Sequence, residues 1–247
     1  MQNTIPMKST INRTARIGGM LYLAIIVLGL FGEMFVRDKL IVSGDAAATA
    51  INIMSSQLLW RTGIAGDLFM HVCDIPLMVV IYILLKPVNK NLALVAVLFN
   101  LVQTVVLVAY KIKLLESLFL VGSADYLKVF NPQQLDALAY LAIKSDAYGF
   151  GIGLIFFGFG CLVFGYLIFR SQYLPRTIGV LMQIAGLCYL VNSFSLLLFP
   201  GFAARIFPTI LAPAFIAELS FCIWLLVKGV NVPRWNERVK AAGISGI

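Results

Sequence analysis

The stretch Gly63–Leu85, GIAGDLFMHVCDIPLMVVIYILL, decides the fold. It is apolar and long enough to cross a bilayer, since about 20 helical residues span the hydrocarbon core. It nevertheless contains three ionisable residues, Asp67, His71 and Asp74. Their spacing places all three on one narrow face of a helix. Because an ionisable side chain in hydrocarbon costs about 2.5–3.5 kcal/mol, this face must turn toward other helices or water.

The composition of the whole chain agrees with that stretch. Hydrophobic residues make up 61% and charged residues 12% of the 247 positions, against roughly 45–50% and 25% in soluble domains. The net charge of +8 does not indicate nucleic-acid binding, because the basic residues lie between apolar segments and near the C-terminus. The sequence therefore predicts an all-α polytopic membrane protein whose environment is the lipid bilayer, with no nucleic-acid partner.

Six apolar segments predict a single bundle over residues 1–247. The expected spans are 15–35, 63–85, 92–114, 147–169, 178–198 and 209–227. Eleven of the 19 Lys and Arg residues fall on the side of both termini, in short loops and tails. By the excess of positive charge on the inner side, both termini are expected in the cytoplasm of a bacterium, with the chain in its plasma membrane.

Two short amphipathic helices are expected outside the membrane. The first follows Ser43-Gly44-Asp45, which has the composition of a helix start. The second begins at Asn131-Pro132, with Gln134 at the third helical position. The alternative for this second segment is one long, bent helix through Asp146, which periodicity does not exclude.

The fourth span carries six glycines on two opposite faces. Gly151, Gly158 and Gly165 form one face, and the other contains Gly149, Gly153 and Gly160. Small residues allow membrane helices to approach closely, so this span is expected between two neighbours. The fifth span has a similar face with Gly179 and Gly186. Such faces could also bind a partner protein or a second copy of the chain.

The polar residues inside the spans are the candidate site. We expect Asp67, His71, Asp74 and Glu218 to bind a ligand or protons. Supporting polar groups are Gln103, Tyr110, Lys111, Asn192 and Ser193. The acids can pair with Lys111 or Arg61, face water, or be buried and protonated. Asp67 and His71, one turn apart, could form a proton relay. Glu33 and Asp146 are expected at the membrane interface.

Other chemistries find little support. The chain has one histidine and four cysteines without metal-type spacing, so we expect neither a metal nor a cofactor. The cysteines are interpreted as small packing residues. Phosphate-loop, dinucleotide and Gly-x-Ser-x-Gly motifs do not occur, and no catalytic residue is assigned.

Four stretches carry a family resemblance. They are TARIGGMLYLAIIVLGLFGEMFV, GDAAATAINI, GDLFMHVCDIPLMVVIYILLKPVNKNLAL and LIFFGFGCLVFGYLIFRSQYLPRTIGVLMQIAGLCYLVNSF. The chain resembles, over about residues 14–233, a bacterial integral-membrane family named domain of unknown function four-three-eight-six. The resemblance implies a similar membrane topology and no particular activity.

Three functional hypotheses follow from these residues. The first is a protein that binds or transports a small cationic or proton-linked ligand in an acidic intramembrane cavity. The second is an intramembrane enzyme acting on a lipid, with Asp67 and His71 as acid–base groups. The third is an accessory or scaffold subunit that docks through its glycine faces.

Overall fold

The computed structural model describes residues 7–243, and all regular secondary structure in that range is helical. Six helices are long and apolar enough to span a membrane. They cover Thr10–Leu40, Gln57–Leu85, Lys90–Leu120, Pro132–Ser171, Arg176–Leu198 and Thr209–Val227. Each predicted span lies within one of these helices, so the chain is a multi-pass helical membrane protein, as its sequence predicts.

The first of these spans is continuous but not uniform. It consists of α1 (Met7–Leu30), the π-helix η1 (Phe31–Arg37) and α2 (Asp38–Leu40). After a turn, α3 (Ala46–Ser55) forms the first expected short helix, and the side chain of Asp45 accepts a hydrogen bond from the Ala48 amide. The predicted helix start at Asp45 is therefore confirmed.

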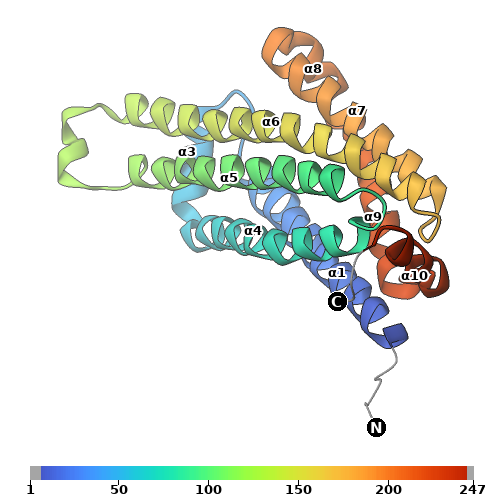
Figure 1. The fold of residues 1–247 in the computed structure, drawn as a ribbon. Helices are drawn as coiled ribbons and strands as arrows, with labels where there is room; N and C mark the ends of the chain where they lie inside the picture. Colours follow the sequence, from blue (N-terminus) through green and yellow to red (C-terminus); the bar gives the residue numbers. More distant parts are fainter. Residues whose placement is uncertain (1–6, 244–247) are drawn as a thin grey trace.

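Two long helices follow the second span and form an extended hairpin (Figure 1). After α4 (Gln57–Leu85), α5 (Lys90–Leu120) leads through η2 (Asp125–Val129) to α6 (Pro132–Ser171). With 40 residues, α6 is about 60 Å long, which exceeds the thickness of a bilayer. The tip of the hairpin therefore projects beyond the other helices.

The start of α6 decides between the two interpretations of its sequence. Asn131 and Gln134 form a reciprocal capping box, as their spacing predicts. The helix then runs without interruption to Ser171. The expected separate second short helix is therefore wrong, and one long helix passes through Asp146. Capping fixed where the helix begins, and no residue between Leu135 and Asp146 breaks it.

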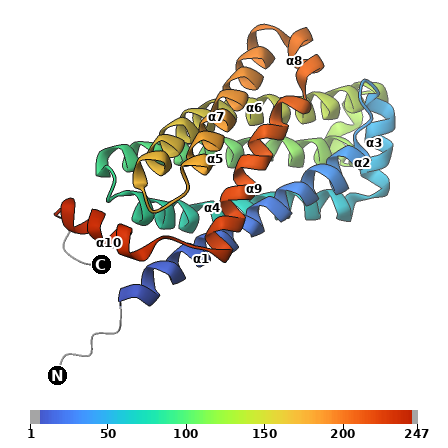
Figure 2. The same ribbon diagram turned by 90° about the vertical axis from the view of Figure 1, so that its right-hand side faces the viewer.

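The remaining helices complete the bundle (Figure 2). They are α7 (Arg176–Leu198), α8 (Pro200–Ile206), η3 (Thr209–Leu211), α9 (Ala212–Val227) and α10 (Val232–Ala241). The main helix contacts form a closed ring in which α1 packs on α4, α4 on α5, α5 on α6, α6 on α7, α7 on α9 and α9 on α1. The first and last spans are therefore neighbours, and every long helix borders the interior.

The two glycine faces of α6 are covered within the chain. Cβ atoms at Gly149, Gly153 and Gly160 would meet Tyr110, Leu107 and Phe99, all on α5. Those at Gly151, Gly158 and Gly165 would meet residues of α7. This arrangement confirms the predicted position of this span between two neighbours.

Prolines do not interrupt the spans. Pro76 lies inside α4, which continues to Leu85. Pro213 lies in the first turn of α9, where its missing N–H has no helical acceptor to satisfy. Each of these two helices is therefore continuous.

Candidate functional site

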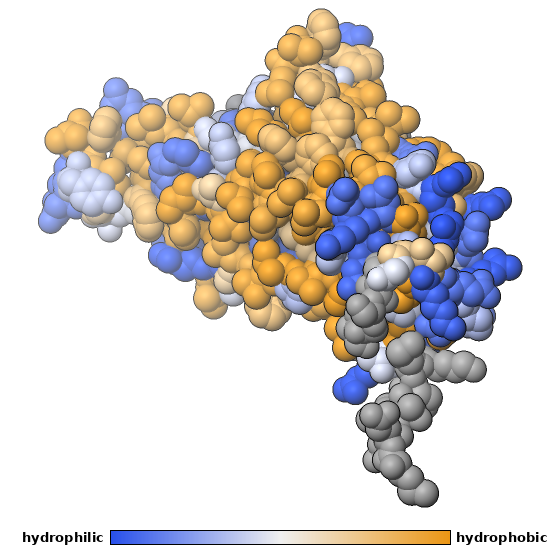
Figure 3. Space-filling model, viewed as in Figure 1, coloured by the Kyte–Doolittle hydropathy of each residue, from blue (hydrophilic) through white to orange (hydrophobic). Residues whose placement is uncertain are grey.

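A layer of buried polar residues separates two apolar clusters. One cluster lies toward α3 and includes Ile53, Trp60 and Leu114. The larger one lies toward α10 and includes Leu84, Ile168 and Phe221. Between the residues that each helix contributes to the two clusters lie Asp67 and His71 on α4, Gln103, Thr104 and Lys111 on α5, and Asp146 on α6. The interior therefore consists of apolar, polar and apolar layers, and Figure 3 shows the mainly apolar outer surface around it.

Asp67 is the centre of an ion-pair network. Its side chain is 1% exposed. Oδ2 lies 2.6 Å from Nη1 of Arg37 and 3.3 Å from Nζ of Lys111. The network extends outward, because Nε of Arg37 donates to Oε2 of Glu33 at 2.6 Å. It also extends to α6, where Lys111 lies 3.1 Å from Oδ1 and 3.2 Å from Oδ2 of Asp146.

Close helix packing brings this network together. Gly32 is buried, and a Cβ atom there would lie 2.5 Å from Oδ1 of Asp67. Gly63, one turn before Asp67, is packed against Val36 in the same way. Both lie at the π-helix η1, a form that occurs mainly as short segments inside helices, often at functional sites. Two glycines and the wider turn therefore let α4 approach η1 closely enough for Arg37 to reach Asp67.

His71 and Asp74 form a second cluster on the same face of α4. Nδ1 of His71 lies 2.9 Å from Oδ2 of Asp74. The hydroxyl of Thr104 on α5 donates to the same oxygen at 3.2 Å. The other ring nitrogen, Nε2, is buried and has no hydrogen-bond partner among residues 7–243. His71 therefore pairs with Asp74 rather than with Asp67, which differs from the expected relay.

Glu218 lies in a third position, on α9. Tyr189 on α7 donates a hydrogen bond to its Oε1. Glu218 therefore joins α9 to α7, and it is not part of the Asp67 network.

The supporting residues have different surroundings. Lys111 is part of the Asp67 network, as one of the expected pairings predicts, whereas Arg61 is exposed and makes no ion pair within residues 7–243. Tyr110 packs its ring on Gly149. The other three, Gln103, Asn192 and Ser193, are buried, and the Ser193 hydroxyl has no partner in the described part of the chain.

Three participants were not foreseen in these roles. Arg37 follows an apolar segment and precedes two charged residues, so its sequence context is that of a loop. Asp146 was expected at the interface, but it is 6% exposed and paired with Lys111, because α6 starts fourteen residues earlier. No feature of the sequence around Thr104 marks it as a member of the site. The sequence signal that could have indicated the burial of Asp146 is the capping box at Asn131, because it starts the helix that runs through Asp146.

The site contains more acidic than basic groups. Three carboxylates, Glu33, Asp67 and Asp146, share two cations, Arg37 and Lys111. Asp74 adds a further acid beside His71. Within the described residues, no group of three or more His, Cys, Asp or Glu side chains is arranged to hold a metal ion. The four cysteines are free thiols.

The fold and this interior define a class: a multi-pass helical membrane protein with a buried layer of ionisable groups. The family model described as "Domain of unknown function (DUF4386)" matches residues 17–229, and the chain belongs to that family. The chain is also 29% identical over 168 residues to an uncharacterized protein of Archaeoglobus fulgidus. That match covers 67% of this chain and 83% of the relative. No solved structure matches the chain significantly.

Proposed function

We propose that the protein binds and exchanges a small cation, a proton in the simplest case, within its polar layer. The observation that carries this proposal is the order of the acidic groups. The Glu33 carboxylate is 53% exposed, Asp67 is linked to it through Arg37, and Asp74 lies two turns further along α4. Glu218 bonds to Tyr189, a member of the larger apolar cluster. Buried ionisable residues in membrane helices are costly, and they typically mark ion or proton pathways.

The proposed path has an open and a closed end. Glu33 is in contact with the surroundings at the α3 end and bonds directly to Arg37, which bonds to Asp67. Below Asp74, the larger apolar cluster separates the polar layer from the α10 end. Binding from the α3 side requires only local rearrangement of ion pairs, whereas transport across the membrane also requires the apolar cluster to open.

His71 is the group best placed to pass a proton between Asp67 and Asp74. It lies one helical turn from Asp67 and bonds to Asp74 through Nδ1, while Nε2 stays without a partner. A neutral imidazole can accept a proton at one nitrogen and release one at the other. The proposal therefore assigns proton transfer to His71, and cation binding to the carboxylates of Asp67 and Asp74.

The test is ion flux in proteoliposomes with a pH-sensitive dye inside and an imposed membrane potential. Asp74→Asn is expected to reduce proton flux strongly, because it removes the charge that faces His71. Asp38→Asn is the matched control, because Asp38 is exposed and forms no ion pair within residues 7–243. Equal flux in the wild type and Asp74→Asn would end the proposal.

A further inference from the structure

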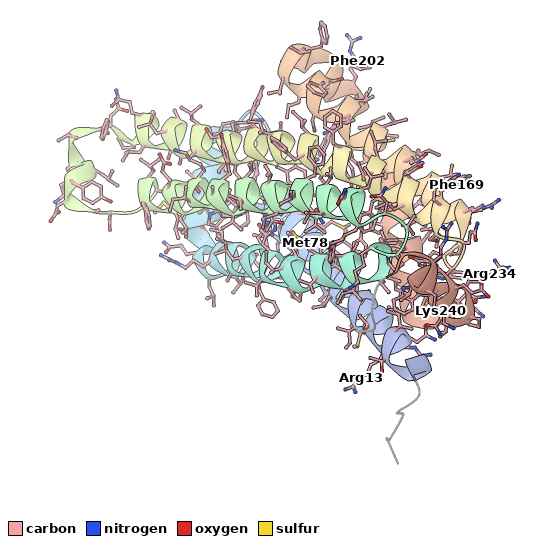
Figure 4. All side chains as sticks on the ribbon, viewed as in Figure 1. Arg13, Met78, Phe169, Phe202, Arg234 and Lys240 are labelled. Atoms are coloured by element: carbon pink, nitrogen blue, oxygen red, sulfur yellow. The ribbon has the colours of Figure 1, made fainter. Side chains whose placement is uncertain are left out.

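A pocket of about 620 Å³ lies at the α10 end, away from the polar layer. It is formed between the α6–α7 connection and α10, and its lining residues are Gln172, Leu174, Pro175, Arg176, Arg234 and Glu237. Figure 3 shows a hydrophilic surface at this end, and Figure 4 places Arg234 there, near Phe169 and Lys240.

The wall formed by α10 is fixed to the bundle. Nη1 of Arg234 donates to the Gln172 carbonyl oxygen at 3.1 Å, and the Asn231 amide donates to the Tyr173 carbonyl oxygen at 3.1 Å. On its other face, α10 buries Val232 and Trp235. The pocket is therefore a feature of the folded bundle rather than of a free tail.

The charged side chains of the pocket lack ion-pair partners among the described residues. Arg176, Arg234 and Glu237 form no ion pair within residues 7–243. The guanidinium of Arg176 lies over the ring of Phe169, 5.6 Å from its centre, which leaves its N–H groups available. Arg176 also opens α7, and the residue before it, Pro175, offers no side-chain cap. The positive end of that helix dipole adds to the two arginine charges.

The position of the pocket restricts the ligand. It lies where α6 ends and α7 begins, which is the level of lipid headgroups for helices that span a bilayer. Two guanidinium groups match a phosphate, to which arginine donates paired hydrogen bonds. A single carboxylate beside them matches an ammonium group. We propose that this pocket binds a phosphoethanolamine group, with the phosphate between Arg176 and Arg234 and the ammonium on Glu237.

The chemistry is shared by a phospholipid headgroup and by the free headgroup ester, so the experiment has two arms. Purified protein in mild detergent is titrated with phosphatidylethanolamine or phosphatidylglycerol, and retained lipid is counted by native mass spectrometry. In parallel, soluble phosphoethanolamine and inorganic phosphate are titrated by calorimetry. The Arg176→Gln/Arg234→Gln variant is compared with Arg13→Gln/Lys240→Gln, which removes the same charge from exposed positions at the same end.

The expected result is about tenfold weaker binding for each pocket arginine removed, as for loss of a charge-assisted hydrogen bond, and little change in the control. Glu237→Gln is expected to abolish the preference for phosphatidylethanolamine over phosphatidylglycerol. Because Arg234 also holds Gln172, Arg176→Gln alone tests the site if the double variant fails to fold. Binding of soluble phosphoethanolamine as tightly as the lipid would assign the site to the free ester. Equal losses in both double variants would overturn the proposal.

Discussion

Arg37 and Asp67, thirty residues apart in the chain, form a direct ion pair in which Nη1 lies 2.6 Å from Oδ2. The arginine belongs to the π-helical end of the first span, and the aspartate to the buried face of the second. The bond therefore ties α4 to η1 at the level where the polar layer begins.

Arg37→Met is expected to destabilise the protein by about 3 kcal/mol, because breaking a buried pair leaves a charge without its partner. Glu33→Gln, which removes the exposed partner of the same arginine, should cost about 0.5 kcal/mol. Reversible denaturant unfolding in detergent measures both values. Similar losses in the two variants would show that the Arg37–Asp67 bond does not hold the helices together.

Lys111→Met should lower the free energy of unfolding more than Lys113→Met does. Lys111 is 8% exposed and lies between Asp67 and Asp146, so its loss leaves two buried carboxylates facing each other. We expect a loss of about 3–5 kcal/mol, or a fold that recovers only when one acid is replaced by Asn. Lys113 pairs with Glu116 at a partly exposed position, and its replacement should cost under about 1 kcal/mol. Melting temperatures of the two variants in the same detergent provide the comparison.

The contact of α6 with α7 predicts a difference between two glycines. A Cβ at Gly165 would lie 2.5 Å from the Gly179 carbonyl oxygen and 2.8 Å from the Gln183 amide nitrogen, both backbone atoms. Gly165→Ala should therefore destabilise by about 1–3 kcal/mol, since the helices must move apart. Gly201 on α8 has no neighbour within 4 Å, so Gly201→Ala should be neutral or slightly stabilising. An equal effect at both sites would contradict the close packing.

Tyr173, in the connection between α6 and α7, predicts a dependence of stability on alkaline pH. Burial raises the pKa of its phenol above the ordinary value of 10.0, and its hydroxyl donates to the Leu84 carbonyl oxygen at 2.5 Å. The unfolded chain loses this proton near pH 10 while the native state keeps it. The contribution of the protonated Tyr173 phenol to the stability of the fold is therefore complete below about pH 10 and declines above it.

Tyr173→Phe should lower the unfolding free energy by about 1 kcal/mol at neutral pH. Its stability should then fall less steeply than that of the wild type between about pH 9 and pH 11. Tyr126→Phe, at a 69% exposed position, is the control. Parallel pH profiles for wild type and Tyr173→Phe would contradict the assignment.

The sequence predicted where the helices form and which face of the second span is polar. The hydropathy of each span and the capping at Asp45 and Asn131 are local properties, and they predicted where helices form. The face shared by Asp67 and His71 is also local, because it depends only on helical spacing, and both side chains are buried.

The pairing of charges depended on information that spacing does not contain. Lys111 was one of two expected partners for the acids, and only the packing of α5 on α4 selects it over Arg61. Arg37 reaches Asp67 through a long side chain from a position that hydropathy alone assigns to the end of a span. Asp146 is buried because α6 begins at Pro132 and packs on α5 before residue 147, where the predicted span begins.

The closed ring of helices has a consequence for biogenesis. The contacts of α9 with α1 and α7 complete the enclosure, and α9 is synthesised after the other five described spans. Until then, a nascent chain holds Tyr189 without Glu218. A chain that terminates before α9 therefore leaves the Tyr189 hydroxyl without this acceptor, and it also lacks the contacts that close the ring.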